Sequence, residues 1–332
     1  MPTPCPSDHD LPSSPFVSGS AALTHWGVIQ AQGEEAAHFL HNQLTQDVLL
    51  LPVGQSRLAA FCSAKGRMQA SFVVIKTAPD TVLLVLNQDL LAQTLKRLSM
   101  FVMRAKVKLC DASALFQLRG LLGDSATAVL PDAAPWHTRE QDGAYAIALY
   151  PALTAGGHIA RVLWLAPADH EWPVAPEAPL AWWSWAEVLS GVPLLSQALF
   201  EAFVPQMLNY ESVGGVNFKK GCYPGQEVVA RSQFRGTLKR RTALVHSPVA
   251  LSAGQEVFSP ADPEQACATV VLAAPRPSVA GQDLGFDALV SGTMESMPNG
   301  WYVGAVKGDG DGAVPKADLA FLPLPYPLLE DI

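Results

Sequence analysis

The stretch KKGCYPGQEVVAR, residues 219–231, decides how the rest of the sequence is interpreted. Pro224 is typical of the first residue of a helix, and the glutamine and glutamate that follow it suit the first turn. The stretch therefore predicts a helix that begins near Pro224, with Cys222 just before it. Unpaired amide groups and the helix dipole stabilise an anion at such a position, and the two lysines that open the stretch add positive charge. A Cys222 thiolate is favoured there.

The same residues have a second interpretation. An isolated cysteine is among the residue types most often buried in proteins, so Cys222 could be a small residue packed in a tight turn. Gly221 and Gly225 would then serve the geometry of that turn. The residues by themselves leave a reactive thiol and a packed thiol equally open.

The composition is that of a folded protein with two or three domains. Of the 332 residues, 49% are hydrophobic and 16% charged, and no apolar run approaches the ~18 residues of a membrane-spanning helix. The first 17 residues hold five prolines and no lysine or arginine, which predicts a disordered tail, no secretory signal and a cytoplasmic protein. The five cysteines are widely spaced without a C-x-x-C pair, so we expect reduced thiols and no metal site.

Positive charge is concentrated in one part of the chain. The net charge is −8, a balance that repels nucleic-acid phosphates unless basic residues gather locally. Residues 219–241 are such a gathering, because seven of these 23 residues are basic and only Glu227 is acidic. This basic window predicts an anion-binding surface and makes tRNA a candidate partner, while a solvated helix face is the alternative.

The strand and helix patterns predict an α+β fold. Strands expected at residues 57–61 and 68–76 flank a turn at 63–66 and form a hairpin, and a helix is expected at 180–190. After residue 239 the pattern changes to short strands separated by Gly, Pro and Asp, which suits a small β-barrel.

The stretch at 219–231 closely resembles the K-G-C-[YF]-x-G-Q-E-x-x-[AS]-[KR] signature of the YgfZ family, folate-binding relatives of the glycine-cleavage T-protein. The matching residues are Lys220, Gly221, Cys222, Tyr223, Gly225, Gln226, Glu227 and Arg231. The resemblance continues through Trp26 and residues 40–48, 64–68, 191–193, 203–206 and 322–326, so it covers roughly residues 18–328.

This resemblance implies a T-protein-like ring of two α+β units and a C-terminal antiparallel β-barrel around a channel that binds tetrahydrofolate. Its implied parts are a tail at 1–17, a folate-binding α+β unit at 18–112 and 180–243, a second α+β unit at 113–179, and a barrel at 244–332. In the family two tryptophans line the folate site, and Trp26 and Trp183 lie in the matching contexts. Aromatic faces stack on flat ring ligands, whereas core packing is the alternative for both side chains.

The function that the resemblance implies is that of an accessory protein for the assembly or repair of iron-sulfur clusters in other enzymes, and thereby for tRNA modification. Cys222 would be its working thiol, and iron-sulfur enzymes or assembly proteins would be its partners. The alternatives are a folate-dependent one-carbon transferase of unknown substrate and a tRNA-binding module that uses residues 219–241.

The aminomethyl transfer of T-proteins is not expected. In those proteins a carboxylate follows the hairpin turn, but no Asp or Glu occurs here between Asp47 and Asp80. Lys65 and Arg67 flank Gly66 in the turn itself, where they form either a seat for an anion such as a glutamate tail or a solvated turn.

Overall fold

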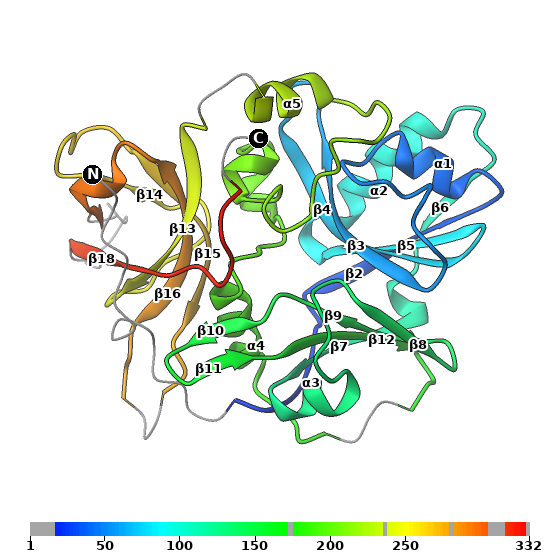
Figure 1. Ribbon diagram of the computed structural model, residues 1–332, viewed down its shortest axis with the longest axis horizontal. Helices are drawn as coiled ribbons and strands as arrows, with labels where there is room; N and C mark the ends of the chain where they lie inside the picture. Colours follow the sequence, from blue (N-terminus) through cyan, green and yellow to red (C-terminus); the bar gives the residue numbers. More distant parts are fainter. Residues whose placement is uncertain (1–16, 172–174, 235–237, 279–281, 305–315, 330–332) are drawn as a thin grey trace.

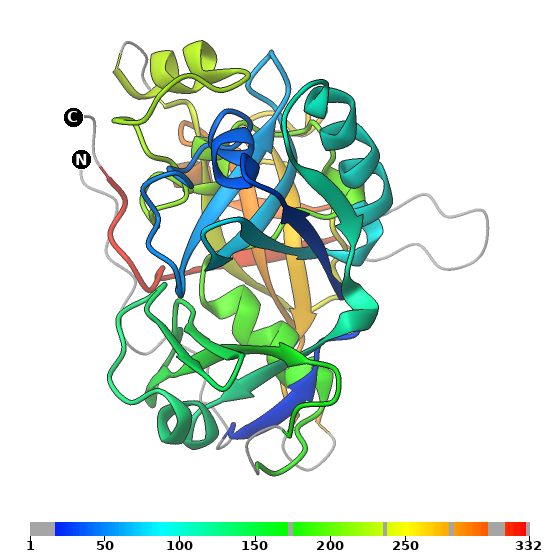
Figure 2. The same ribbon diagram turned by 90° about the vertical axis from the view of Figure 1, so that its right-hand side faces the viewer.

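The computed structural model describes residues 17–171, 175–234, 238–278, 282–304 and 316–329. The tail expected at residues 1–17 therefore lies, apart from Val17, outside the described residues. Two five-stranded sheets with their helices lie one above the other, and a six-stranded antiparallel sheet stands beside them (Figure 1). Figure 2 shows the six-stranded sheet behind the other two. The α+β fold with a C-terminal barrel is confirmed.

The first sheet has the strand order β3-β4-β5-β2-β6. Its strands are β2 (Trp26–Gln32), β3 (Gln55–Cys62), β4 (Met68–Ala78), β5 (Thr81–Asn87) and β6 (Lys108–Asp111). Strands β3 and β4 form the predicted hairpin, in which Arg57 pairs with Val74 and Phe61 with Ala70. The helices α1 (Ala36–His41) and α2 (Gln88–Val102) pack on this sheet.

The second sheet has the order β1-β7-β12-β9-β8. Its strands are β1 (Gly19–Ala22), β7 (Phe116–Leu122), β8 (Thr138–Gln141), β9 (Ala144–Ala148) and β12 (Arg161–Pro167), accompanied by η2 (Ser113–Leu115), α3 (Asp124–Val129) and the hairpin of β10 (Ala152–Thr154) and β11 (Gly157–Ile159). The expected division at residue 112 placed β1 in the first unit, but β1 pairs with β7. The chain turns at residues 23–25, where the Trp26 amide donates to the Leu23 carbonyl, so β1 and β2 belong to different sheets.

The C-terminal sheet closes into a barrel with the order β14-β15-β16-β13-β18-β17. Its strands are β13 (Arg240–Ser247), β14 (Glu256–Val257), β15 (Ala268–Pro275), β16 (Phe286–Thr293), β17 (Trp301–Val303) and β18 (Ala317–Leu322), with η5 (Met297–Asn299) before β17. Phe258 and Tyr302 exchange two backbone hydrogen bonds of 2.9 Å, which join the two edges. The first barrel strand begins at Arg240, four residues before the expected boundary.

Helix α4 (Leu180–Leu189) touches all three parts of the molecule. It packs on β15 and β16 of the barrel and on β1 and β10 of the second unit. Trp185 donates its indole N–H to the buried carboxylate of Asp287 at 2.7 Å, which fixes the helix to the barrel. Trp183, two residues earlier, contacts Trp26 of the first unit.

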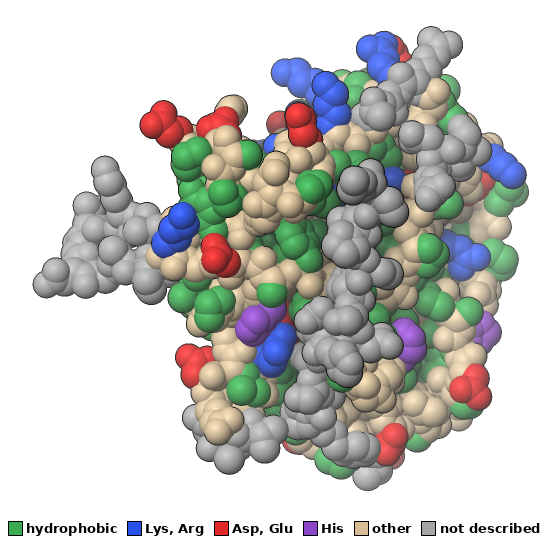
Figure 3. Space-filling model, turned by 60° about the vertical axis from the view of Figure 1, so that its left-hand side comes forward, with side chains coloured by type: hydrophobic (Ala, Val, Ile, Leu, Met, Phe, Trp, Pro, Cys, Tyr) green, Lys and Arg blue, Asp and Glu red, His purple; other side chains and the backbone are tan. Residues whose placement is uncertain are grey.

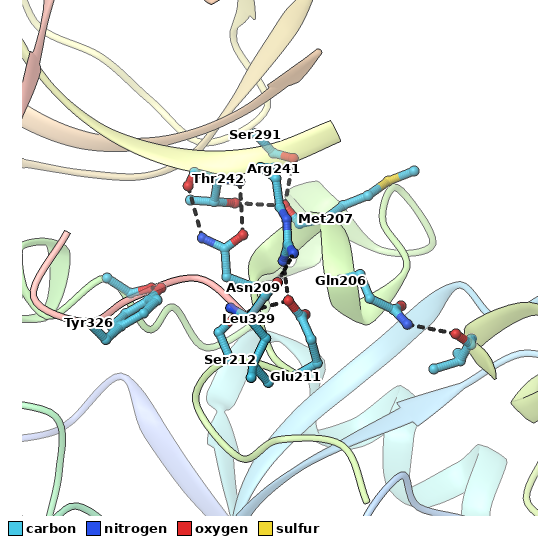
Figure 4. Close-up of polar contacts among 12 residues, drawn as sticks. Gln206, Met207, Asn209, Glu211, Ser212, Arg241, Thr242, Ser291, Tyr326 and Leu329 are labelled. Atoms are coloured by element: carbon cyan, nitrogen blue, oxygen red, sulfur yellow. Dashed lines mark hydrogen bonds and ion pairs between the residues drawn. The ribbon is translucent and has the colours of Figure 1, made fainter. Parts of the chain in front are cut away.

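The segment after α4 fastens the barrel to the first unit (Figure 4). It contains η3 (Gln197–Leu199) and η4 (Pro205–Leu208) and leads to α5 (Gln226–Phe234). Asn209 donates to the Thr242 carbonyl of β13 at 2.9 Å, and the buried pair Glu211 and Arg241 lies beside it. Gln206 donates to the Val229 carbonyl of α5 at 2.6 Å. In the described part of the chain, no helix combines the length and the apolar character that crossing a membrane requires.

Candidate functional site

An inner pocket lies where the two α+β units meet α4. Its walls include Trp26 at the start of β2, Arg161 at the start of β12 and Glu187 on α4, together with Leu58 of β3. The free space between these walls is about 20 Å³, which is room for a water molecule. Common ligand sites hold ~300–1,000 Å³, so a ring ligand enters only if the walls of the pocket move apart.

The two predicted folate tryptophans are brought together, but only one of them lines this pocket. Trp26 and Trp183 meet edge to face, with ring centres 5.8 Å apart and planes at 78°. Trp26 forms part of the pocket wall, whereas Trp183 is fully buried and not among the residues that line the pocket. Trp183 packs directly on β7, because Gly120 has no side chain there; a Cβ at Gly120 would lie 2.2 Å from the indole ring. Trp183 therefore supports the wall.

Arg161 and Glu187 put opposite charges into the pocket wall, although both are buried, with exposed fractions of 3% and 6%. Burial raises the pKa of the Glu187 carboxyl to about 7, against the attraction of Arg161 and a hydrogen bond from the Leu194 backbone. Burial also lowers the pKa of Arg161 to about 10. The Arg161 guanidinium lies 4.5 Å from the centre of the Trp183 ring. Glu187 can therefore both accept and donate a proton near neutral pH.

Several polar atoms around the pocket lack partners. The indole N–H groups of Trp26 and Trp183 and the Nε of Arg161 are buried and make no hydrogen bond. Buried polar groups are almost always hydrogen-bonded, so these atoms are suited to a ligand or water. Aromatic walls, unpaired donors and a carboxylate fit a flat heteroaromatic ring with donors and acceptors on its edge, such as a pterin. Among the described residues, no three His, Cys, Asp or Glu side chains gather as metal ligands.

Arg161 and Glu187 were not predicted as site residues. A signal was present for both: Glu187 is the single charge in the helix LAWWSWAEVL, and Arg161 is the single charge in the strand RVLWLAP. One charge in an otherwise apolar element is rarely buried without a partner or a function. Their proximity, however, comes from packing α4 against the second sheet.

The motif at residues 219–231 begins with a cysteine loop, residues 219–225. Lys220 is buried, and its ammonium donates to the carbonyls of His41 and Leu44 at the end of α1. That burial lowers the pKa of Lys220 to about 8. Tyr223 is also buried, with its ring 4.7 Å from the Lys220 ammonium, whereas Cys222 between them is exposed. The loop thus presents a thiol to solvent between two anchors.

The helix after the loop begins at Gln226, two residues later than predicted. Gly225 adopts φ +81° and rests on the hairpin turn of the first sheet, where a Cβ would lie 2.4 Å from the Ser63 carbonyl oxygen. Because Gly225 adopts this left-handed conformation, the helix begins only after it. Glu227 and Arg231 form a 2.8 Å ion pair on the exposed face of α5, a contact that contributes little.

Over its described residues, 219–234 and 238–241, the basic window does not form one continuous charged surface. Lys220 and Arg241 are buried in internal contacts, and Arg240 donates to the carbonyls of Cys267 and Ser291. Lys219 and Lys239 remain exposed. In Figure 3, Lys and Arg side chains gather at the top edge, the end of the molecule at which Figure 1 draws α5. Part of the positive charge of the window is therefore engaged in internal contacts of the fold.

The chain is similar to known proteins in both sequence and fold. The model of the GCVT N-terminal domain matches residues 18–150. The crystal structure of glycine cleavage system aminomethyltransferase T from Bartonella henselae matches with a TM-score of 0.60 at 16% identity, over 95% of this chain and 87% of that one. The molecule therefore has the fold of the aminomethyltransferase T proteins.

Two relatives with similar sequences show to which family within this class the chain belongs. An uncharacterized protein of Haemophilus influenzae is 30% identical over 228 residues, 68% of this chain and 71% of the relative. The tRNA-modifying protein YgfZ of Photobacterium profundum is 30% identical over 243 residues, 67% of this chain and 68% of the relative. The chain belongs to the YgfZ family.

Proposed function

We propose that this protein binds tetrahydrofolate, with the pterin ring in the inner pocket. The observation that carries the proposal is the buried Arg161 and Glu187 beside the aromatic wall of Trp26. In the bound state Trp26 packs on the ring, Glu187 accepts from its amino and amide N–H groups, and Arg161 donates to its carbonyl oxygen. Trp183 positions Trp26 and Arg161.

The proposed role of the folate-bound protein is to support iron-sulfur cluster assembly or repair in other enzymes, and thereby tRNA modification. The tRNA-modifying name of its relatives supports the second part. The exposed Cys222, held between Lys220 and Tyr223, supports the first, because a thiol that serves a partner protein has to reach solvent in a fixed position.

Complementation tests this role. A bacterial strain that lacks its own YgfZ protein receives the wild-type gene, Cys222→Ser or the matched control Cys267→Ser, and mass spectrometry measures the tRNA nucleosides made by iron-sulfur enzymes. We expect wild type and Cys267→Ser to restore these nucleosides and Cys222→Ser to fail at equal protein level. Full restoration of these nucleosides by Cys222→Ser would show that the Cys222 thiol has no part in the proposed function.

One observation favours a second candidate, a folate-dependent one-carbon transferase. Glu187 is the single carboxylate among the described residues that line the inner pocket, and its raised pKa suits a proton acceptor at neutral pH. It stands on α4, far in sequence from the position after the hairpin turn where T-proteins carry their carboxylate. Purified protein with tetrahydrofolate and a panel of one-carbon donors distinguishes a transferase from an accessory protein.

A further inference from the structure

A separate pocket, the α2 pocket, lies between helix α2 and the β3-β4 hairpin. Its apolar walls come from Phe61 of β3, Met100 of α2 and Phe200, the residue that follows η3. The free space between its walls is about 220 Å³, against about 20 Å³ in the inner pocket. None of the described residues lines both pockets. The α2 pocket is therefore distinct from the proposed folate site and has room for a bulky apolar group.

Three polar atoms of residues that line the α2 pocket make no hydrogen bond. They are the Oε1 of Gln69, the Nε2 of Gln93 and the hydroxyl of Thr94. The amide of Gln69 is fixed in this orientation, because its Nε2 donates to the Glu201 carboxylate at 2.5 Å. Gln69 and Thr94 are buried, with exposed fractions of 1% and 3%. Since buried polar groups are almost always hydrogen-bonded, this set of acceptor, donor and hydroxyl points to a ligand.

The unpaired acceptor and donor suit a peptide group, which offers one N–H and one carbonyl oxygen. Gln69 can accept from the N–H, and Gln93 can donate to the carbonyl. These atoms are closed to bulk water, so a peptide that reaches them has to displace a side chain at the mouth of the pocket. Met100 lies there, and it moves easily because its side chain is unbranched and 71% exposed.

The surroundings of the α2 pocket are basic and apolar. Lys96 and Arg97 line it, and no acidic side chain does so among the described residues. Within the described part of the chain, neither cation has a side-chain hydrogen bond or an ion pair. The end of α2 exposes Phe101 and, just beyond it, Met103. Phe101 meets Phe61 edge to face at 6.5 Å, so the pocket continues into this exposed helix end. Exposed apolar side chains that adjoin a pocket are typical of protein–protein interaction sites.

We propose that the α2 pocket binds an acidic segment of a partner protein, which inserts one apolar side chain between the apolar walls. Gln69 and Gln93 hydrogen-bond to the backbone of this segment, and Lys96 and Arg97 contact its carboxylates. In a chain with a net charge of −8, two unpaired cations at one pocket favour an acidic partner over other proteins. This docking site goes beyond the proposed function, and it depends neither on folate nor on the cysteine loop.

Selection from short random peptides displayed on phage tests the proposal. We expect the immobilised wild-type protein to enrich peptides that combine Asp or Glu with Leu, Met or Phe. Fluorescence anisotropy then measures the affinity of the most enriched peptide for the wild type, Lys96→Gln/Arg97→Gln and Thr94→Val. The matched control is Lys219→Gln/Lys239→Gln, which removes the same charge from exposed residues outside the α2 pocket.

The variants distinguish a binding role from a structural one. Thr94→Val removes a buried hydroxyl that has no partner, so the free energy of unfolding should not fall in urea titration. Its affinity for the peptide should fall about fivefold, because one hydrogen bond to the peptide is lost. Lys96→Gln/Arg97→Gln should also bind about fivefold more weakly, with a smaller dependence on salt, because two charge contacts are lost. The control should bind the peptide like the wild type.

Several results would overturn the proposal. If the wild type enriches no peptide, or enriches basic or purely polar ones, the pocket does not bind an acidic, apolar segment. Wild-type affinity in both Lys96→Gln/Arg97→Gln and Thr94→Val would place the peptide elsewhere on the protein. An equal loss in the control would show that the peptide responds only to the overall charge. If the wild type binds single-stranded RNA but none of the peptides, and Lys96→Gln/Arg97→Gln weakens RNA binding, the basic mouth belongs to a nucleic-acid site.

Discussion

Gly225 packs backbone to backbone on Gly66. A Cβ at Gly225 would lie 2.6 Å from the Cα of Gly66, and one at Gly66 would lie 2.9 Å from the Cβ of Val228. The contact docks the cysteine loop on the β3-β4 turn and puts Lys65 and Arg67 beside the start of α5. Two segments that are about 160 residues apart in the sequence therefore meet at the C-terminal end of the cysteine loop.

Substituting Gly225 should loosen its contact with the β3-β4 turn. Gly225→Ala places a methyl group against backbone atoms at a positive φ, whereas Gly54→Ala tests a similar φ of +78° in open space. We expect Gly225→Ala to lower the free energy of unfolding by about 1–3 kcal/mol more than Gly54→Ala, because the added atom overpacks the contact. Urea unfolding of both variants measures the difference. Equal losses would show that the contact is not tight.

The cysteines should differ in reactivity according to their burial. Cys222 is exposed, Cys110 and Cys267 are partly buried, and Cys62 is fully buried, where burial raises the pKa of its thiol to about 12. Among these four cysteines, which are those that the structure describes, we expect iodoacetamide to modify Cys222 first and Cys62 only after unfolding. Mass spectrometry of peptides sampled over time gives the order. A Cys222 that reacts no faster than Cys267 would contradict the solvent-facing loop.

Glu187 should make stability depend on pH. Its carboxyl has a pKa of about 7 in the folded protein and an ordinary value of 4.5, so between these values the folded protein holds a proton that the unfolded chain releases. The contribution of Glu187 to stability is therefore full below pH 4.5 and falls by about 3 kcal/mol up to pH 7. Urea unfolding of the wild type and Glu187→Gln across this range isolates the effect. Parallel curves would mean that Glu187 is not perturbed.

The protein should not perform the aminomethyl transfer of glycine cleavage. The start of β4 lacks the carboxylate that the T-protein pattern places there, and the side chains at residues 68–72 are apolar or carry an amide or a hydroxyl group. With aminomethyl-loaded carrier protein and tetrahydrofolate, we expect no methylene-tetrahydrofolate above the uncatalysed level, while a T-protein serves as the positive control. Turnover at about 1–10³ per second would contradict this expectation.

The sequence predicts the features that depend on local pattern. The β3-β4 hairpin follows from two β-rich runs around residues 63–66, and α4 follows from an apolar stretch that ends before Gly191. The resemblance of the cysteine motif to the YgfZ signature made it possible to predict the whole fold. Helix α5 begins after Pro224 because Gly225 adopts a left-handed conformation in its contact with Gly66. A contact between residues so far apart in the sequence cannot be predicted from a local pattern.

The features that depend on long-range packing could not be predicted in this way. Arg161 and Glu187 line the same pocket because α4 packs on β1 and β10 of the second unit. Strand β1 joins the second sheet because the chain turns before Trp26. Charge counting over residues 219–241 likewise predicted one basic surface. It could not show that Lys220 and Arg241 are turned inward, since both are bound by partners distant in sequence.

Calorimetric titration with tetrahydrofolate tests the central claim, folate binding in the inner pocket, most directly. Wild type, Trp26→Ala and Glu187→Gln are compared with Trp182→Ala, a control on the same helix whose side chain does not line the pocket. We predict one bound folate in the wild type and in Trp182→Ala, and at least tenfold weaker binding in Trp26→Ala and Glu187→Gln, all four proteins being folded by circular dichroism. Wild-type affinity in both pocket variants, or no binding to the wild type, would contradict the account.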